Sequence, residues 1–120
     1  MSRNKVGVLP LPPTGSTAGT NPAFTTTTNS DAVEPFHTNR TFEVYGTTSS
    51  GSGSAVVNWE VRNSENAAWS ILATITVTLG TSTASGGATS SAAWKFVRAN
   101  VTTLSGTGAQ VFCDLGTAPL

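Results

Sequence analysis

Charged side chains are scarce in this 120-residue sequence. Lys and Arg together number six, as do Asp and Glu, so charged residues make up 10% of the chain and the formal net charge is zero. A soluble domain usually carries about a quarter charged residues. Nucleic-acid binding requires a basic surface that displaces counterions from phosphates. The charge balance therefore predicts no nucleic-acid partner.

Cysteine, histidine and long apolar runs are also scarce. The single cysteine, Cys113, excludes an internal disulfide and a thiolate metal site, and its alternation with Val111 and Leu115 predicts a buried side chain. His37 is the only imidazole and has no nucleophile motif nearby. The sequence contains no run of about 18 apolar residues, so we expect no membrane-spanning segment. The N-terminal residues lack the apolar core of a signal peptide, so we expect cytoplasmic synthesis without export.

The carboxylates are scattered along the chain. Glycoside hydrolysis requires two carboxylates that face each other across a cleft. Glu43 and Glu60 are a conceivable pair if their strands are neighbours, but ion pairs with Arg62 or Arg98 are the simpler interpretation. We therefore expect no catalytic residue, no metal and no cofactor, and hence no enzyme.

Threonine and serine are abundant, and so is strict alternation of apolar and polar residues. The chain has 21 Thr and 14 Ser. Within Ala55–Leu79, two alternating runs are separated by the polar sequence Asn63–Asn66, which predicts two half-buried strands joined by a turn. On these strands Trp59 and Trp69 fall on the core side.

Further strands are predicted at 41–45, 94–102 and 110–115, with Val97, Ala99 and Val101 in the core. Small-residue loops are predicted at 47–54 and 80–93. This spacing, without any helical period, indicates an all-β fold: a compact antiparallel β-sandwich of jelly-roll-like or immunoglobulin-like type.

Residues 1–37 differ from the sandwich domain predicted at 38–120. They hold five of the six prolines and no sustained alternation, so we expect an extended arm. One alternative is a disordered leader. Another is that Val6–Leu11 forms an extra edge strand, with Pro10 and Pro12 confined to its solvent side. The arm is too apolar for a pure linker, so we expect it to lie along a partner.

Two groups of apolar and aromatic residues are the candidate partner-binding sites. Leu9, Leu11, Phe24 and Phe36 lie in the arm, and Trp94, Phe96 and Arg98 lie on the outward side of one strand. A neutral, hydroxyl-rich surface does not repel its own copies. We therefore expect a working state that is an assembly.

Several motifs between Ser52 and Gly116 resemble a group of small β-rich virion proteins of tailed bacteriophages. The motifs read VVNWEV, NSENAAW, ATITVTL, WKFVRANVT and SGTGAQV. The resemblance implies a non-enzymatic structural protein on the virion surface. The first role that it implies is that of a capsid decoration (cement) protein on the head, with the major capsid protein as its partner. Because capsid decoration commonly sits at symmetry axes, the resemblance also implies binding to copies of itself, with a trimer as the first expectation and a dimer as the second.

A tail or fibre module that binds glycans or the host cell surface is the alternative, with Trp94, Phe96 and Arg98 as a stacking platform. The chain also has a weaker likeness to discoidin-type jelly rolls. Here Glu65-Asn66 replaces their Asp-Gly, and the chain lacks the acidic loop that calcium binding requires.

Overall fold

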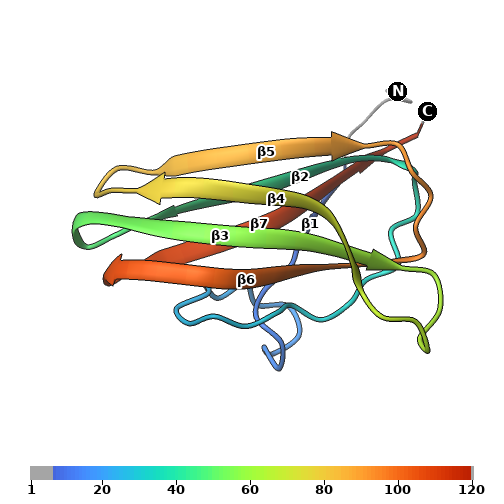
Figure 1. Cartoon of the computed structure of the whole chain (residues 1–120), viewed down its shortest axis with the longest axis horizontal. Helices are drawn as coiled ribbons and strands as arrows, with labels where there is room; N and C mark the ends of the chain where they lie inside the picture. Colours follow the sequence, from blue (N-terminus) through green and yellow to red (C-terminus); the bar gives the residue numbers. More distant parts are fainter. Residues whose placement is uncertain (1–6, 120) are drawn as a thin grey trace.

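The computed structural model describes residues 7–119 and consists of two antiparallel β-sheets packed face to face (Figure 1). One sheet has the strand order β1-β7-β2-β5, and the other has the order β4-β3-β6. The strands are β1 (Gly7–Pro10), β2 (Asn39–Thr47), β3 (Ser50–Arg62), β4 (Ser70–Leu79), β5 (Ala84–Ser90), β6 (Phe96–Thr107) and β7 (Gln110–Ala118). The predicted all-β sandwich is confirmed.

The core lies between the sheets and follows the predicted alternation. Phe42 and Val44 of β2 face Val57 and Trp59 of β3, and all four side chains are at most 1% exposed. The Phe42 and Trp59 rings lie 4.9 Å apart, centroid to centroid. Val97, Ala99 and Val101 are buried as predicted, and so is Cys113. A period of two thus positions most of the core.

A β-bulge changes the alternation in β4. Trp59 pairs with Ala73, but the next residue, Glu60, pairs with Ile71, so one residue of β4 is left over. An extra residue reverses the faces on its far side. Ile71 is therefore 60% exposed, and Trp69 lies on the outer face instead of in the core. The prediction that Trp69 packs in the core is wrong for this reason.

Both predicted small-residue loops contain strand residues. Residues 50–54 extend β3, and residues 84–90 form β5, which pairs with β2 over seven residues. Glycine and serine have low strand propensity, which is why the sequence indicated loops. At Gly86 the missing side chain has a packing role, because a Cβ there would lie 2.9 Å from Ile75 Cγ2. Glycine thus allows β5 to approach β4 closely.

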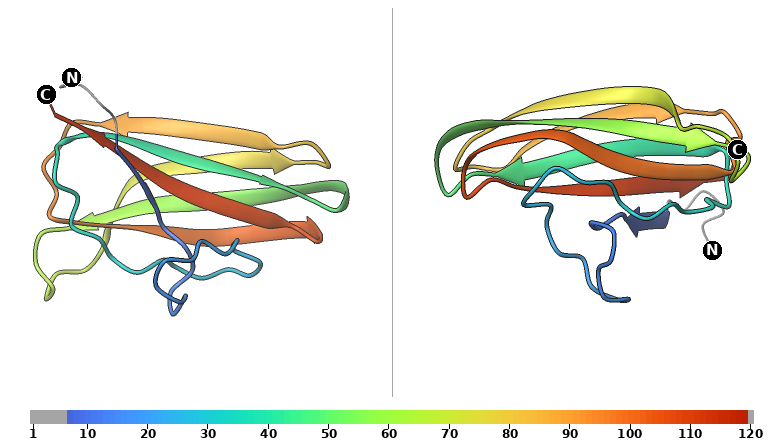
Figure 2. Two further views of the ribbon diagram at one scale, coloured as in Figure 1. Left: turned by 180° about the vertical axis from the view of Figure 1, so that it is seen from behind. Right: turned by 60° about the horizontal axis from the view of Figure 1, so that its bottom comes forward.

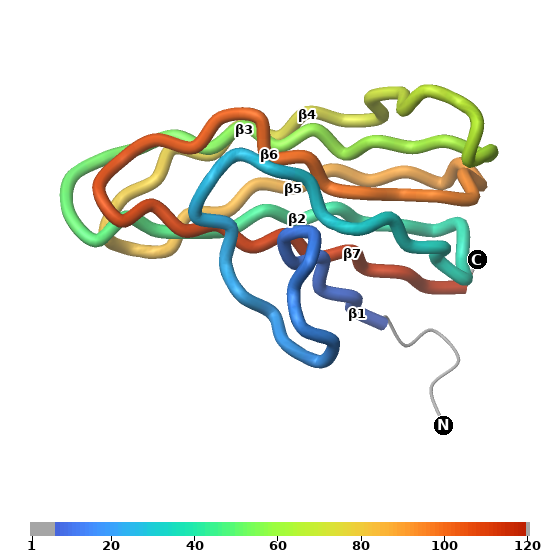
Figure 3. The backbone as a smooth tube through the Cα atoms, turned by 90° about the horizontal axis from the view of Figure 1, so that it is seen from below, coloured from blue at the N-terminus to red at the C-terminus, as the bar shows by residue number. Residues whose placement is uncertain are grey.

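From residue 7 on, the N-terminal segment packs on the chain's own sandwich. β1 pairs antiparallel with β7 as an edge strand, as the edge-strand alternative anticipated. The segment between β1 and β2, residues 11–38, is called the strap here. Figures 2 and 3 show the strap passing beneath the sandwich, from β1 and β7 towards β6, before the chain enters β2.

The strap bonds to both sheets. The Phe24 N–H donates to the Val111 carbonyl of β7 at 2.8 Å, and the Ser30 N–H donates to the Ala99 carbonyl of β6 at 2.8 Å. Val33 exchanges two further backbone bonds with Val97. Because β6 and β7 belong to different sheets, the strap closes this side of the sandwich. The strap is therefore part of the packed fold.

Candidate functional site

The predicted partner-binding residues fall into three environments. Leu11 is 2% exposed and Phe24 is fully buried, both inside the chain's own core. The prediction that these two contact a partner is therefore wrong, because the strap delivers them between the sheets. Leu9 on β1 is 43% exposed, and Phe36 is 97% exposed. Trp94, Phe96 and Arg98 are only partly exposed.

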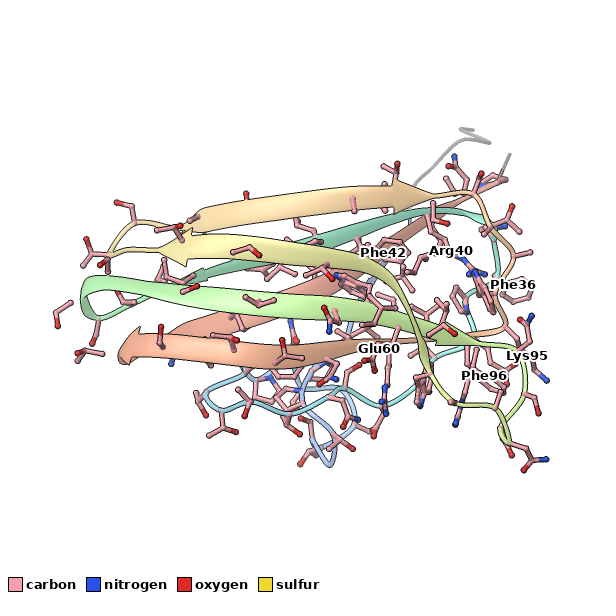
Figure 4. The ribbon with its side chains drawn as sticks, viewed as in Figure 1. Phe36, Arg40, Phe42, Glu60, Lys95 and Phe96 are labelled. Carbon is pink, nitrogen blue, oxygen red and sulfur yellow. The ribbon has the colours of Figure 1, made fainter. Side chains whose placement is uncertain are left out.

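Three segments converge around Phe36 at one end of the sandwich, and we call this surface the aromatic end. They are residues 34–36 at the end of the strap, residues 63–66 between β3 and β4, and residues 94–96 before and at the start of β6. Figure 4 shows Phe36, Lys95 and Phe96 together at this end. Two open hollows of about 430 and 270 Å³ lie between these segments.

A buried arginine holds two of these segments together. Arg40 on β2 is 3% exposed. Its Nε donates to the His37 carbonyl at 2.7 Å, and its Nη1 donates to the Trp94 carbonyl at 2.8 Å. A longer bond of 3.5 Å runs from Nη2 to the Pro35 carbonyl. The guanidinium therefore links the backbone on both sides of Phe36 to the residue preceding Lys95.

The burial of Arg40 is costly, since a buried charge normally requires an ionic partner. Among the described residues, its hydrogen bonds go to carbonyl oxygens and no carboxylate pairs with it. Burial lowers the pKa of the guanidinium below its ordinary value, a direction that agrees with the lack of a compensating anion. Arg40 thus fixes the position of the exposed Phe36.

The third segment is held by Asn63 and Lys95. The Lys95 N–H donates to Asn63 Oδ1 at 2.9 Å, which ties the β3–β4 connection to the start of β6. The Lys95 ammonium lies 5.1 Å from the centre of the Phe96 ring, a cation–π contact. Glu34 and Glu65 line the hollows beside Lys95. The aromatic end thus has exposed and half-exposed aromatic rings with a polar rim of both charge signs.

Arg98 takes part in a neighbouring cluster on the outer face of the β4-β3-β6 sheet. Its Nε donates to Glu60 Oε1 at 2.7 Å, and Asn100 Nδ2 donates to the other carboxylate oxygen at 3.1 Å. The Trp69 ring stacks against the guanidinium groups of Arg62 and Arg98, at 4.3 and 4.4 Å from the ring centre. These contacts engage Arg98 within the chain itself.

The side chains that could take part in catalysis or bind a metal do not come together in one site. Glu43 faces outward from the β1-β7-β2-β5 sheet, opposite Asp114 in the ladder, whereas Glu60 belongs to the other sheet. Glu43 and Glu60 are therefore not neighbours. Burial raises the pKa of the Cys113 thiol to about 12, so this thiol is not ionised at neutral pH. Within residues 7–119, no group of three His, Cys, Asp or Glu residues is placed to hold a metal ion.

The sequence identified Phe36 and Phe96 but not the residues that position them. Arg40 follows the polar run His37-Thr-Asn, and no role was predicted for it from the sequence. One signal was available: the alternation of β2 puts Arg40 on the same side as Phe42 and Val44. Lys95 was visible only as the residue between Trp94 and Phe96.

No helix in the part of the chain that the structure describes has the length and apolar character needed to cross a membrane. Comparisons of the chain with protein-family models, with curated proteins and with solved structures give no match.

Proposed function

We propose that this protein is a non-enzymatic structural component of a bacteriophage virion, a capsid decoration protein that binds the major capsid protein on the head surface. The sequence resemblance between Ser52 and Gly116 supports the class of protein. The observation that carries the binding role is Phe36, a large apolar side chain that is 97% exposed on a backbone held by a buried arginine.

An exposed aromatic ring on a fixed backbone suits a binding anchor for an energetic reason. Burial of a phenylalanine side chain contributes about 1.5–3 kcal/mol. Ordering a mobile loop on binding offsets part of such a gain, at about 1–2 kcal/mol for each residue whose backbone is fixed. Arg40 has already restricted the backbone around Phe36 in the free protein. Most of the burial energy then remains available for affinity.

The test is a binding assay with purified heads that lack the protein. We expect the wild-type chain to bind them and Phe36→Ala to bind about thirtyfold more weakly, which corresponds to about 2 kcal/mol. The matched control is Val8→Ala, which also truncates an exposed apolar residue (63% exposed) but lies on β1. It should bind like the wild type.

Two outcomes would overturn the proposal. A reconstruction of purified particles without the protein on the head would reject the placement, and an equal effect of the two substitutions would reject the aromatic end as the binding surface. A positive glycan array together with no binding to heads would instead favour the tail or fibre module. The engagement of Arg98 by Glu60 and Trp69 weighs against that alternative, because its proposed platform needs Arg98 free.

A further inference from the structure

The outer face of the β1-β7-β2-β5 sheet carries a hollow that is separate from the aromatic end. Its volume is about 610 Å³, which lies within the range of known ligand pockets. The floor of the hollow lies at two glycines, Gly87 of β5 and Gly116 of β7, which present no side chain to this face. The residues around this floor include Val8, Thr41 and Thr89.

Two carboxylates also line the hollow. Glu43 of β2 and Asp114 of β7 are directly opposite each other in the ladder. Like charges placed opposite each other destabilise a sheet. Asp114 Oδ1 is buried and accepts no hydrogen bond from any described residue. The carboxylate pair therefore lacks the donors and the positive charge that would compensate it.

An aromatic pair lies beside the carboxylates on the same face. Tyr45 and Phe112 follow Glu43 and precede Asp114 by two residues, and their rings stack with 5.2 Å between centroids. Burial, and then the charges of Asp114 and Glu43, raise the pKa of the Tyr45 hydroxyl. The Tyr45 side chain is thus close enough to both carboxylates to be affected by their charge.

The outer face of the other sheet has the same types of group together with a cation. Glu60 accepts a hydrogen bond from Arg98 Nε at 2.7 Å, and the Arg98 guanidinium lies 4.4 Å from the centre of the Trp69 ring. In this chain, a carboxylate and an aromatic ring on a sheet face thus bind one guanidinium together. Within residues 7–119, no Lys or Arg forms an ion pair with Glu43 or Asp114.

The described Lys and Arg side chains make their contacts elsewhere. Arg40 is buried inside the sandwich and donates to backbone carbonyls. Arg62 and Arg98 stack on Trp69, and Lys95 lies at the aromatic end. The charge of the hollow is therefore complementary to a cation from outside residues 7–119.

We propose that the hollow binds an arginine side chain of a partner chain, with its guanidinium between Glu43 and Asp114 and against the Tyr45 ring. A guanidinium is planar and has five N–H donors, so it can bond to two carboxylates and still stack on an aromatic ring, whereas a lysine ammonium is a point charge. The occupant belongs to a chain because the hollow is open and Val8 beside it is 63% exposed, which offers an apolar contact to residues that flank the arginine. This inference does not depend on the proposed function, because the hollow shares no residue with those of the aromatic end.

The test is an NMR titration of the full chain with a peptide of sequence SVRVS that has blocked ends. We expect saturable shifts of the amides around Glu43, Gly87 and Asp114, and no shifts at the aromatic end. The same peptide with citrulline, the neutral isostere of arginine, should bind at least tenfold more weakly, because hydrogen bonds between charged groups are the strong ones.

Substitutions then test the carboxylates. Asp114→Asn and Glu43→Gln should each weaken binding of the arginine peptide about tenfold. The matched control is Glu65→Gln, which removes the same charge outside the hollow and should leave binding unchanged. Asp114→Asn relieves the opposed charges, so it should melt no lower than the wild type, and its loss of binding then does not reflect a loss of fold.

Other results would overturn the proposal. An absence of saturable shifts, or shifts centred elsewhere, would reject the hollow as the site. Equal binding of the citrulline peptide, or equal effects of Asp114→Asn and Glu65→Gln, would show that the carboxylate pair does not recognise the cation.

The remaining outcomes would identify a different occupant. If acetyl-arginine methylamide binds as tightly as the peptide, the occupant is a small guanidinium compound. If about 1 mM calcium displaces the peptide, it is a metal ion. If the double variant Arg3→Ser, Lys5→Ser binds the peptide at least tenfold more tightly than the wild type, the occupant is the chain's own N-terminal sequence.

Discussion

Phe24 and Phe36 are the same residue type in the same segment, but they have opposite environments. Phe24 is fully buried between the sheets, and Phe36 is 97% exposed. If the strap is part of the fold, Phe24→Ala leaves a cavity in the core while Phe36→Ala removes a ring from solvent. If the N-terminal segment were a free arm, both substitutions would leave the stability of the domain unchanged.

The burial of the two side chains indicates how much each substitution should lower the free energy of unfolding. Truncation of a buried phenylalanine typically costs about 3–5 kcal/mol, whereas an exposed site changes stability by at most about 0.5 kcal/mol. Domains of this size unfold with about 5–15 kcal/mol. Phe24→Ala should therefore remove a large share of the free energy of unfolding. At about 4 °C for each kcal/mol, the melting temperature should fall by about 12–20 °C.

The assay is urea unfolding followed by tryptophan fluorescence, supported by calorimetry. Trp59 is fully buried, so its emission reports the integrity of the core. We expect a lower midpoint and an unchanged slope for Phe24→Ala, and no shift for Phe36→Ala. A loss below about 1 kcal/mol for Phe24→Ala, or equal losses for the two variants, would refute the conclusion that the strap completes the core.

Three further predictions concern polar groups that are buried or partly buried. Arg40→Met should lower the free energy of unfolding by at least about 2 kcal/mol, because it removes the donors to three carbonyls. It should also speed hydrogen exchange at residues 35–38 and 94–96, and unchanged exchange would contradict the role of Arg40 in holding these segments. Cys113 should resist a thiol reagent at pH 8 until the protein unfolds, since burial raises its pKa to about 12 and leaves it 1% exposed; rapid native labelling would contradict this. Burial, and then the nearby Glu43, raise the pKa of Asp114 above its ordinary 3.8, so the native state binds the proton more tightly than the unfolded state does. Asp114 therefore destabilises the fold as the pH rises from 3.8 through the raised pKa. Asp114→Asn should therefore stabilise the protein at pH 7 in thermal melts, with a gain that shrinks below pH 4; a loss at pH 7 would contradict this.

The sequence predicted the parts of the fold that depend on local pattern. Alternation located the strands that carry Phe42, Trp59 and Val97, because each buries one side against the opposite sheet. It failed at Trp69, where an unpaired residue in β4 reverses the alternation, and no local signal marks such a bulge. It also failed in β5, whose glycines and serines became a strand only through pairing with β2.

The sequence identified the exposed residues of the site but not the residues that hold them in place. An aromatic residue beside proline, such as Phe36, stands out in a sequence. The role of Arg40 depends on three carbonyls from two distant segments, and the chain has to fold before they meet. Leu11 and Phe24 were assigned to a partner because prolines interrupt the alternation around them, although both belong to the core.

The place of β7 in its sheet has a kinetic consequence. β7 lies between β1 and β2, and the register pairs Leu9 with Leu115 and Phe42 with Leu115, so both ladders join segments more than 60 residues apart. Loops of that length must close before their contacts contribute any stability, and folds dominated by such distant pairings fold in milliseconds to seconds. The β3–β4 hairpin, by contrast, closes through the short connection at residues 63–69. The β4-β3-β6 sheet is therefore expected to form early, and the strap and β1 to dock in the last and slowest step.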